Sequence, residues 1–195
     1  MTSLDAGRAE LRERQGEGAR YDAPAAPSWD LALARRGTAY FARLLNDLND
    51  AELDAPCADA VASRRAIIAA VGLQARHMAE AIAWCREKGG TAFPDALELN
   101  MDNVALTATL PARALRNLFT HAEVHLNVEW RDMTDVHWDQ SVFGKDGLLL
   151  GLRALPMLRA RSLWRAAFDL RSGARRADLP LGIDIAALSG AFTLP

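Results

Sequence analysis

Two histidines on one predicted helix have a spacing that suits metal chemistry. His121 and His125 are four residues apart, so they would lie on the same helix face, where such a pair can chelate a metal ion. His77 could complete a three-histidine site, with Glu129 one turn further along as a carboxylate ligand. An isolated H-x-x-x-H spacing is a weak signal, so a structural role for both histidines is the alternative interpretation.

A second set of polar side chains lies on the last predicted helix, residues 156–170. This helix has a proline in its first turn and a glycine just past its end. Ser162, Ala166 and Asp169 are spaced i, i+4 and i+7 and therefore share one face. Asp169 could act as a base if an apolar cavity raises its pKa. The alternative is that Asp169 only holds a neighbouring arginine.

The cysteines, Cys57 and Cys85, form neither a disulfide framework nor a metal-binding pattern. Cys85 falls on an apolar helix stripe, which favours a buried, inert thiol over a nucleophile. The N-terminus has no apolar stretch typical of a secretory signal. We therefore expect a cytoplasmic protein with reduced thiols.

The composition is that of an ordinary globular protein. The 195 residues are 50% hydrophobic and 25% charged, enough for one domain with a sizeable core. A net charge of −2 gives no electrostatic reason to bind nucleic acid. No apolar run approaches the roughly 20 residues of a membrane span. The expected binding partner is a small-molecule substrate. The sequence does not determine the oligomeric state, and a homodimer is possible.

Four amphipathic helices dominate the pattern of apolar residues and predict an all-α, up-and-down four-helix bundle with long connecting loops. They cover residues 31–49, 64–88, 112–133 and 156–170. Residues 1–27 read as a polar N-terminal arm, with Tyr21 as its anchor, and 28–195 as the bundle domain. Residues 91–108 are irregular with one short helix, and 134–153 form a long loop of the kind that covers sites. No alternating pattern predicts a strand.

The run R-x-R-x-x-W-x-x-x-x-D-L in residues 156–170 resembles the last helix of the mycothiol-dependent maleylpyruvate isomerase family. That family is a branch of the DinB-like four-helix metalloproteins, and its pattern there is R-E-V-W-x-H-x-V-D-L. Its Glu and His bind a divalent metal, usually zinc. A third ligand ends the motif P-S-x-x-x-G-W-T-R-x-x-V-x-x-H, which corresponds here to residues 56–70. The resemblance covers about residues 20–180 and implies a DinB-like bundle.

The three ligand positions of the family carry other residues in this chain. The two histidines are replaced by Ala70 and Ala166, and the glutamate by Ser162. A serine hydroxyl alone is a poor ligand for zinc, which takes Cys, His or carboxylate. The resemblance therefore implies that the metal is no longer used, and we expect no cofactor. The family's substrate-contacting arginine falls on Asn100, so an anionic substrate would lose that partner too.

The leading functional hypothesis is a metal-free enzyme descended from these isomerases, acting in specialised biosynthesis. A small organic molecule would bind in the bundle cavity and undergo isomerisation, proton transfer or ring closure. The candidate catalytic residues are Gln74, His77, Ser162 and Asp169, and the candidate ligand-binding residues are Ala70, Asn100, Arg165 and Ala166. One alternative is a non-catalytic binding or accessory protein. The other is a thiol-dependent isomerase or transferase with metal at His77, His121 and His125.

Overall fold

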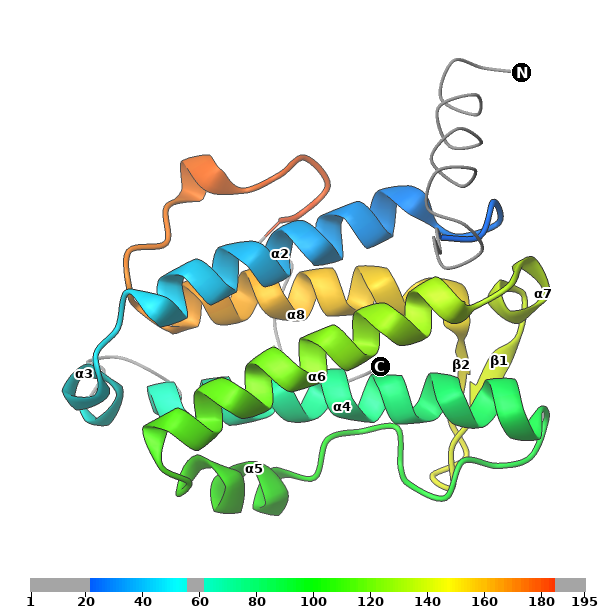
Figure 1. Ribbon diagram of the computed structural model, residues 1–195, viewed down its shortest axis with the longest axis horizontal. Coiled ribbons are helices and arrows are strands. Elements are labelled where there is room, and N and C mark those ends of the chain that lie inside the picture. Colours follow the sequence, from blue (N-terminus) through cyan, green and yellow to red (C-terminus); the bar gives the residue numbers. More distant parts are fainter. Residues whose placement is uncertain (1–21, 56–61, 185–195) are drawn as a thin grey trace, which may run out of the picture.

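The computed structural model describes residues 22–55 and 62–184. Four long helices of this part of the chain pack into one bundle (Figure 1): α2 (Ser28–Asn46), α4 (Arg64–Lys88), α6 (Ala112–Asp132) and α8 (Leu155–Asp169). The expectation of an all-α, DinB-like bundle with long connections is confirmed. Most of the predicted N-terminal arm, including Tyr21, and also Cys57 lie outside the described residues.

Two side chains that reach the end of a neighbouring helix show the relative direction of two pairs of helices. Arg64, at the start of α4, donates from Nε to the carbonyl of Leu170 at the end of α8 (2.9 Å). Arg116, near the start of α6, donates to the carbonyl of Leu45 at the end of α2 (2.6 Å). Thus α4 is antiparallel to α8, and α6 is antiparallel to α2.

The consecutive helices α4 and α6 run in the same direction, because Arg86 near the end of α4 pairs with Glu129 near the end of α6 (2.5 Å). Strict up-and-down alternation therefore does not hold for this pair. The connection over residues 89–111 recrosses the length of the bundle and contains the short helix α5 (Met101–Ala108), as Figure 1 shows. This crossover lies along α4, against which α5 packs.

Local capping chemistry explains both ends of α4. Ser63 caps α4 by accepting a hydrogen bond from the backbone N–H of Ala66 (3.2 Å). The helix ends at Gly89, whose φ of 55° lies in the left-handed region that glycine adopts easily. The segment after α2 contains the short helix α3 (Asp50–Asp54), because Asn49 and Glu52 form a reciprocal capping box.

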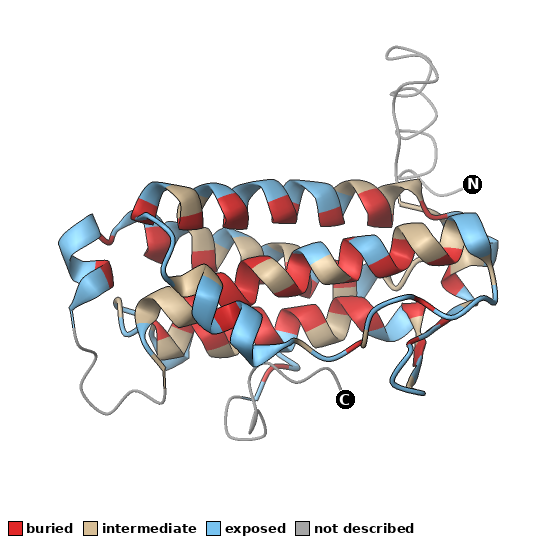
Figure 2. Cartoon of the chain, turned by 90° about the horizontal axis from the view of Figure 1, so that it is seen from below, coloured by how far each residue is buried: buried red, intermediate tan, exposed pale blue. Residues whose placement is uncertain are grey.

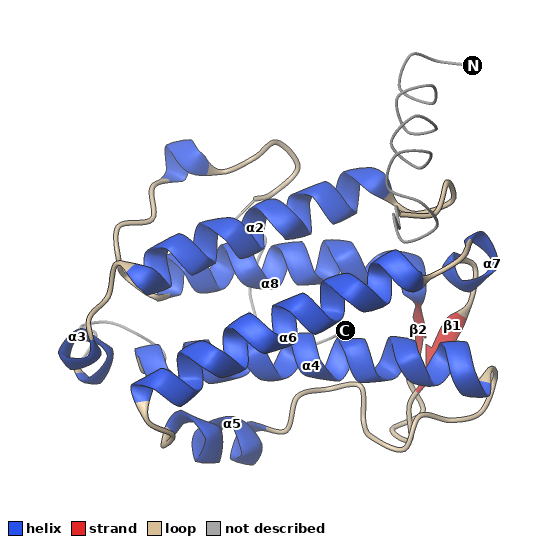
Figure 3. Cartoon of the chain, in the orientation of Figure 1, coloured by secondary structure: helices blue, strands red, loops and turns tan. Residues whose placement is uncertain are grey.

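A small hairpin corrects the expectation that the chain has no strands. After the short helix α7 (Asp135–Trp138), strands β1 (Ser141–Phe143) and β2 (Leu149–Gly151) pair antiparallel (Figure 3), and a 3₁₀ turn leads into α8. Strands of three residues are too short to show alternation in the sequence. Asp146 in the hairpin turn accepts from the backbone N–H groups of Leu97 (2.7 Å) and Leu148 (3.1 Å). The hairpin is thereby tied to the crossover.

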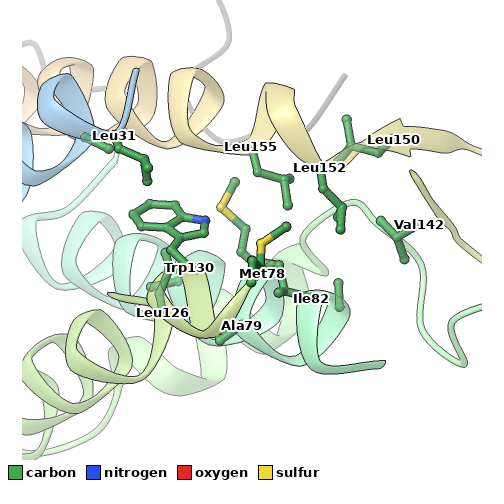
Figure 4. Packing of buried hydrophobic residues seen from close by; sticks show 14 of the residues in the cluster. Leu31, Met78, Ala79, Ile82, Leu126, Trp130, Val142, Leu150, Leu152 and Leu155 are labelled. Carbon is green, nitrogen blue, oxygen red and sulfur yellow. The ribbon is translucent and has the colours of Figure 1, made fainter. Parts of the chain in front are cut away.

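The buried residues lie on the inward faces of the helices (Figure 2). Around Trp130, side chains from all four long helices and the hairpin pack together, as Figure 4 shows. The opposite half of the bundle contains Phe41 against Phe119, with ring centres 5.2 Å apart, and also Ala70 and Ala166. None of the described helices combines the length and apolarity that crossing a membrane requires.

Candidate functional site

The three positions singled out by the family pattern meet where α4 faces α8. Gln74 donates from Nε2 to the Oγ of Ser162 (2.9 Å), and both side chains are buried. Ala70 lies one turn before Gln74, and Ala166 lies one turn after Ser162. Because the two helices are antiparallel, this register places the two alanines opposite each other, in the same buried cluster.

These three residues do not fit a divalent metal ion. Ala70 and Ala166 present only methyl groups, and both are buried in apolar packing. The hydroxyl of Ser162 already accepts a hydrogen bond from Gln74. Zinc and similar ions need imidazole, thiolate or carboxylate donors, and this set supplies none.

A buried polar network that the sequence analysis missed crosses the bundle beside this point. Arg159 is fully buried and donates from Nη1 to the Oε1 of Gln74 (2.6 Å). Its Nη2 pairs with the Oε1 of Glu123, whose Oε2 accepts from the hydroxyl of Thr38 (3.0 Å). The network therefore links side chains of all four long helices through one guanidinium group.

A sequence signal for this network existed. Glu123 lies four residues after Phe119 and three before Leu126, so it falls on the apolar stripe of α6. Arg159 lies four residues before Leu163, on the buried side of α8. An acid and a base that each interrupt an apolar stripe are seldom buried unless they are paired. That combination predicts that each side chain is buried with a partner of opposite charge, without identifying the partner.

His77 and Asn100, both candidate residues, line a pocket of about 390 Å³ between α4 and the crossover. The ring of His77 packs edge-on against Phe93, and its Nε2 is buried with no hydrogen-bond partner among the described residues. Asn100 caps α5 by accepting from the backbone N–H groups of Asp102 and Asn103, which leaves its own amide N–H groups free to donate. The rest of the lining is largely charged: Leu73, Arg76, Glu80, Asp95, Ala96, Glu98, Leu99, Asn103 and Lys145.

Arg165 and Asp169, the last two candidates, form an ion pair on the partly exposed side of α8. The guanidinium Nε lies 3.0 and 2.8 Å from the two carboxylate oxygens. The arrangement matches the alternative interpretation in which Asp169 holds a neighbouring arginine. The candidate residues thus divide among the α4–α8 contact, the pocket at His77 and this surface pair.

The prediction of a relocated metal site at His77, His121 and His125 is wrong. His121 is exposed, and His125 is half exposed with its Nε2 3.4 Å from the Oε1 of Glu129. His77 instead faces the crossover. Within residues 22–55 and 62–184, no group of three or more His, Cys, Asp or Glu could hold a metal ion. The physical reason is that α6 turns its histidine face to solvent while burying its apolar face.

Cys85 is buried, as the apolar stripe predicted, and burial raises the pKa of its thiol above the ordinary value. Its Sγ lies 3.4 Å from the Oε1 of Gln140. A protonated, enclosed thiol is a poor nucleophile. In a Cys57→Ser variant, we expect Ellman's reagent at neutral pH to react with Cys85 at least about 100-fold more slowly in the folded protein than in denaturant. Equal rates would contradict the burial of this thiol.

The crystal structures of mycothiol-dependent maleylpyruvate isomerase and of a histidine-to-alanine mutant of that enzyme resemble this fold. Each superimposes with a TM-score of 0.69 and 27% sequence identity over 78% of this chain and 64% of the isomerase. The chain therefore spans less than two thirds of the length of those enzymes. Neither a protein-family model nor a curated protein matches the sequence.

Proposed function

We propose that this chain, which belongs to the mycothiol-dependent maleylpyruvate isomerase-like family of DinB-like four-helix proteins, is an isomerase-like enzyme that acts on a small organic molecule without a metal ion. The observation that carries this proposal is the pocket at His77, on the helix that also carries Ala70. Ala70, Ser162 and Ala166 stand at the positions of the family's metal ligands; we call them the former ligand positions. The former ligand positions offer no donor that a zinc ion would accept, whereas the pocket contains His77, which can act as an acid or a base.

The pocket supplies the elements that proton-transfer chemistry needs. An imidazole can take a proton from one atom of a substrate and return it to another. His77 lines the pocket, but its Nε2 is buried in this conformation, so a hydrogen bond to a substrate requires the ring to turn toward the pocket. The amide of Asn100 can donate to a substrate oxygen. The volume of about 390 Å³ suits a small organic molecule.

Gln74 and Ser162 have a positioning role in this proposal. Gln74 lies less than one turn before His77 on α4 and is held on both sides, by Ser162 and by Arg159. These buried hydrogen bonds fix the middle of α4 against α8, so the backbone that carries His77 is rigid. A precisely held base is what proton transfer requires.

The test compares the wild-type chain with His77→Ala on extracts of small metabolites in the presence of a metal chelator. Liquid chromatography with mass spectrometry would follow compounds that change retention time without changing mass, since isomerisation conserves every atom. We expect the wild type to convert at least one compound and His77→Ala to lose at least about 100-fold in rate, the typical contribution of a general acid–base group.

The matched control is His121→Ala, which removes an exposed histidine on α6 and should leave the rate unchanged. Conversion that stops when chelator is added would contradict the metal-free mechanism. Conversion that persists in His77→Ala would remove this residue from the mechanism.

A non-catalytic ligand-binding role is the second candidate function. It is favoured by the packing at the family's metal position, where Ala70 and Ala166 are buried rather than open to a cavity. Under this candidate, a compound from the extract would bind and be recovered unchanged. The same experiment therefore distinguishes the two functions.

A further inference from the structure

A second pocket, of about 280 Å³, lies between α2 and α6. It is lined by Arg35, Thr38, Glu123, Val124, Asn127 and Trp130. No residue of this lining belongs to the pocket at His77. We refer to it as the α2–α6 pocket.

Both charged side chains in this lining are already neutralised. The guanidinium of Arg35 makes two hydrogen bonds with the carboxylate of Asp22 (2.5 and 2.7 Å) and one with the Oδ1 of Asn127 (2.9 Å). Glu123 is paired with the buried Arg159. An ion entering the α2–α6 pocket would therefore lose hydration without gaining a free counter-charge.

The pocket nevertheless keeps hydrogen-bond acceptor capacity. Glu123 is only 9% exposed, and each of its carboxylate oxygens accepts one hydrogen bond, Oε1 from Arg159 and Oε2 from Thr38. A carboxylate oxygen can accept two, so one acceptor position on each oxygen is left. The apolar part of the lining comes from Val124 and Trp130.

We infer that the α2–α6 pocket binds a small, uncharged molecule with an apolar ring and one hydroxyl group. The ring would contact Val124 and Trp130, and the hydroxyl would donate to the carboxylate of Glu123. A volume of about 280 Å³ accommodates a single substituted ring. This site is independent of the proposed catalytic pocket at His77.

The probe is p-cresol, and toluene is its matched analogue without the hydroxyl. Isothermal titration calorimetry on the whole chain should show saturable binding of p-cresol at least about tenfold tighter than that of toluene, because a hydrogen bond to a charged acceptor is stronger than a neutral one. Equal affinities for the two probes would overturn the role of Glu123. No saturable binding of p-cresol would overturn the site.

Val124 allows the pocket to be filled without disturbing the core, since its side chain is 61% exposed. Val124→Trp should block the pocket and weaken p-cresol binding at least about tenfold, whereas Val124→Ala leaves the pocket open and should keep the affinity within about threefold. Unchanged binding in Val124→Trp would overturn the inference. His77→Ala should bind p-cresol normally, and a loss there would place the probe in the other pocket and also overturn it.

The result of the p-cresol binding test does not depend on the result of the metabolite-conversion test of the proposed function. An α2–α6 pocket that binds p-cresol supports the inference even if no metabolite is converted. Conversion that depends on His77, with no binding of p-cresol, supports the proposed function and refutes the inference.

Discussion

Replacing Arg159 with methionine is expected to lower the free energy of unfolding by about 3–5 kcal/mol, the usual cost of removing one partner of a buried ion pair. The guanidinium is fully buried and holds both Glu123 and Gln74. Without it, the carboxylate of Glu123 stays in the bundle interior with only the hydroxyl of Thr38 as a donor. The measurement is urea denaturation followed by circular dichroism.

Two further variants make this result specific. Arg165→Met breaks the partly exposed pair with Asp169 and should cost no more than about 1 kcal/mol. Adding Glu123→Leu to Arg159→Met removes the stranded carboxylate and should recover much of the lost stability. A loss below about 1 kcal/mol for Arg159→Met alone would show that the buried pair does not hold the bundle together.

Rebuilding the ligand set of the family is expected to create a metal site. The triple change Ala70→His, Ser162→Glu and Ala166→His places two imidazoles and a carboxylate where α4 faces α8, and zinc accepts such a set. The antiparallel register set by the Gln74–Ser162 hydrogen bond brings the three positions together. Zinc at about one hundred times its dissociation constant should raise the melting temperature by about 5–10 °C.

Without metal, the triple variant should be less stable than the parent chain, and bound zinc should restore part of the lost stability. Without zinc, its polar groups lie in apolar packing, so its stability should fall by a few kcal/mol, roughly as for unpaired buried polar groups. The parent chain serves as one control and Ala70→His with Ala166→His alone as the other, and both should show a smaller zinc response. A folded triple variant with no zinc-dependent shift and no bound metal by elemental analysis would show that the three positions do not converge.

The sequence by itself determined the four long helices and their facing sides. Ser63 and Gly89 mark the start and end of α4 by local capping chemistry, and the structure places those ends at the same residues. The spacing of Ser162 and Ala166 on α8 correctly predicted a shared face, because helical periodicity is a local property. The family pattern then predicted the bundle, which is confirmed.

Only the tertiary structure decided which polar groups meet. The connection over residues 89–111 is long enough either to turn back or to recross the bundle, so local patterns did not determine that α6 runs parallel to α4. That direction places Glu123 beside Arg159 and turns His121 and His125 to solvent. A histidine or a carboxylate takes its role from the charges and burial around it. Those depend on contacts between residues far apart in the chain, which no local pattern encodes.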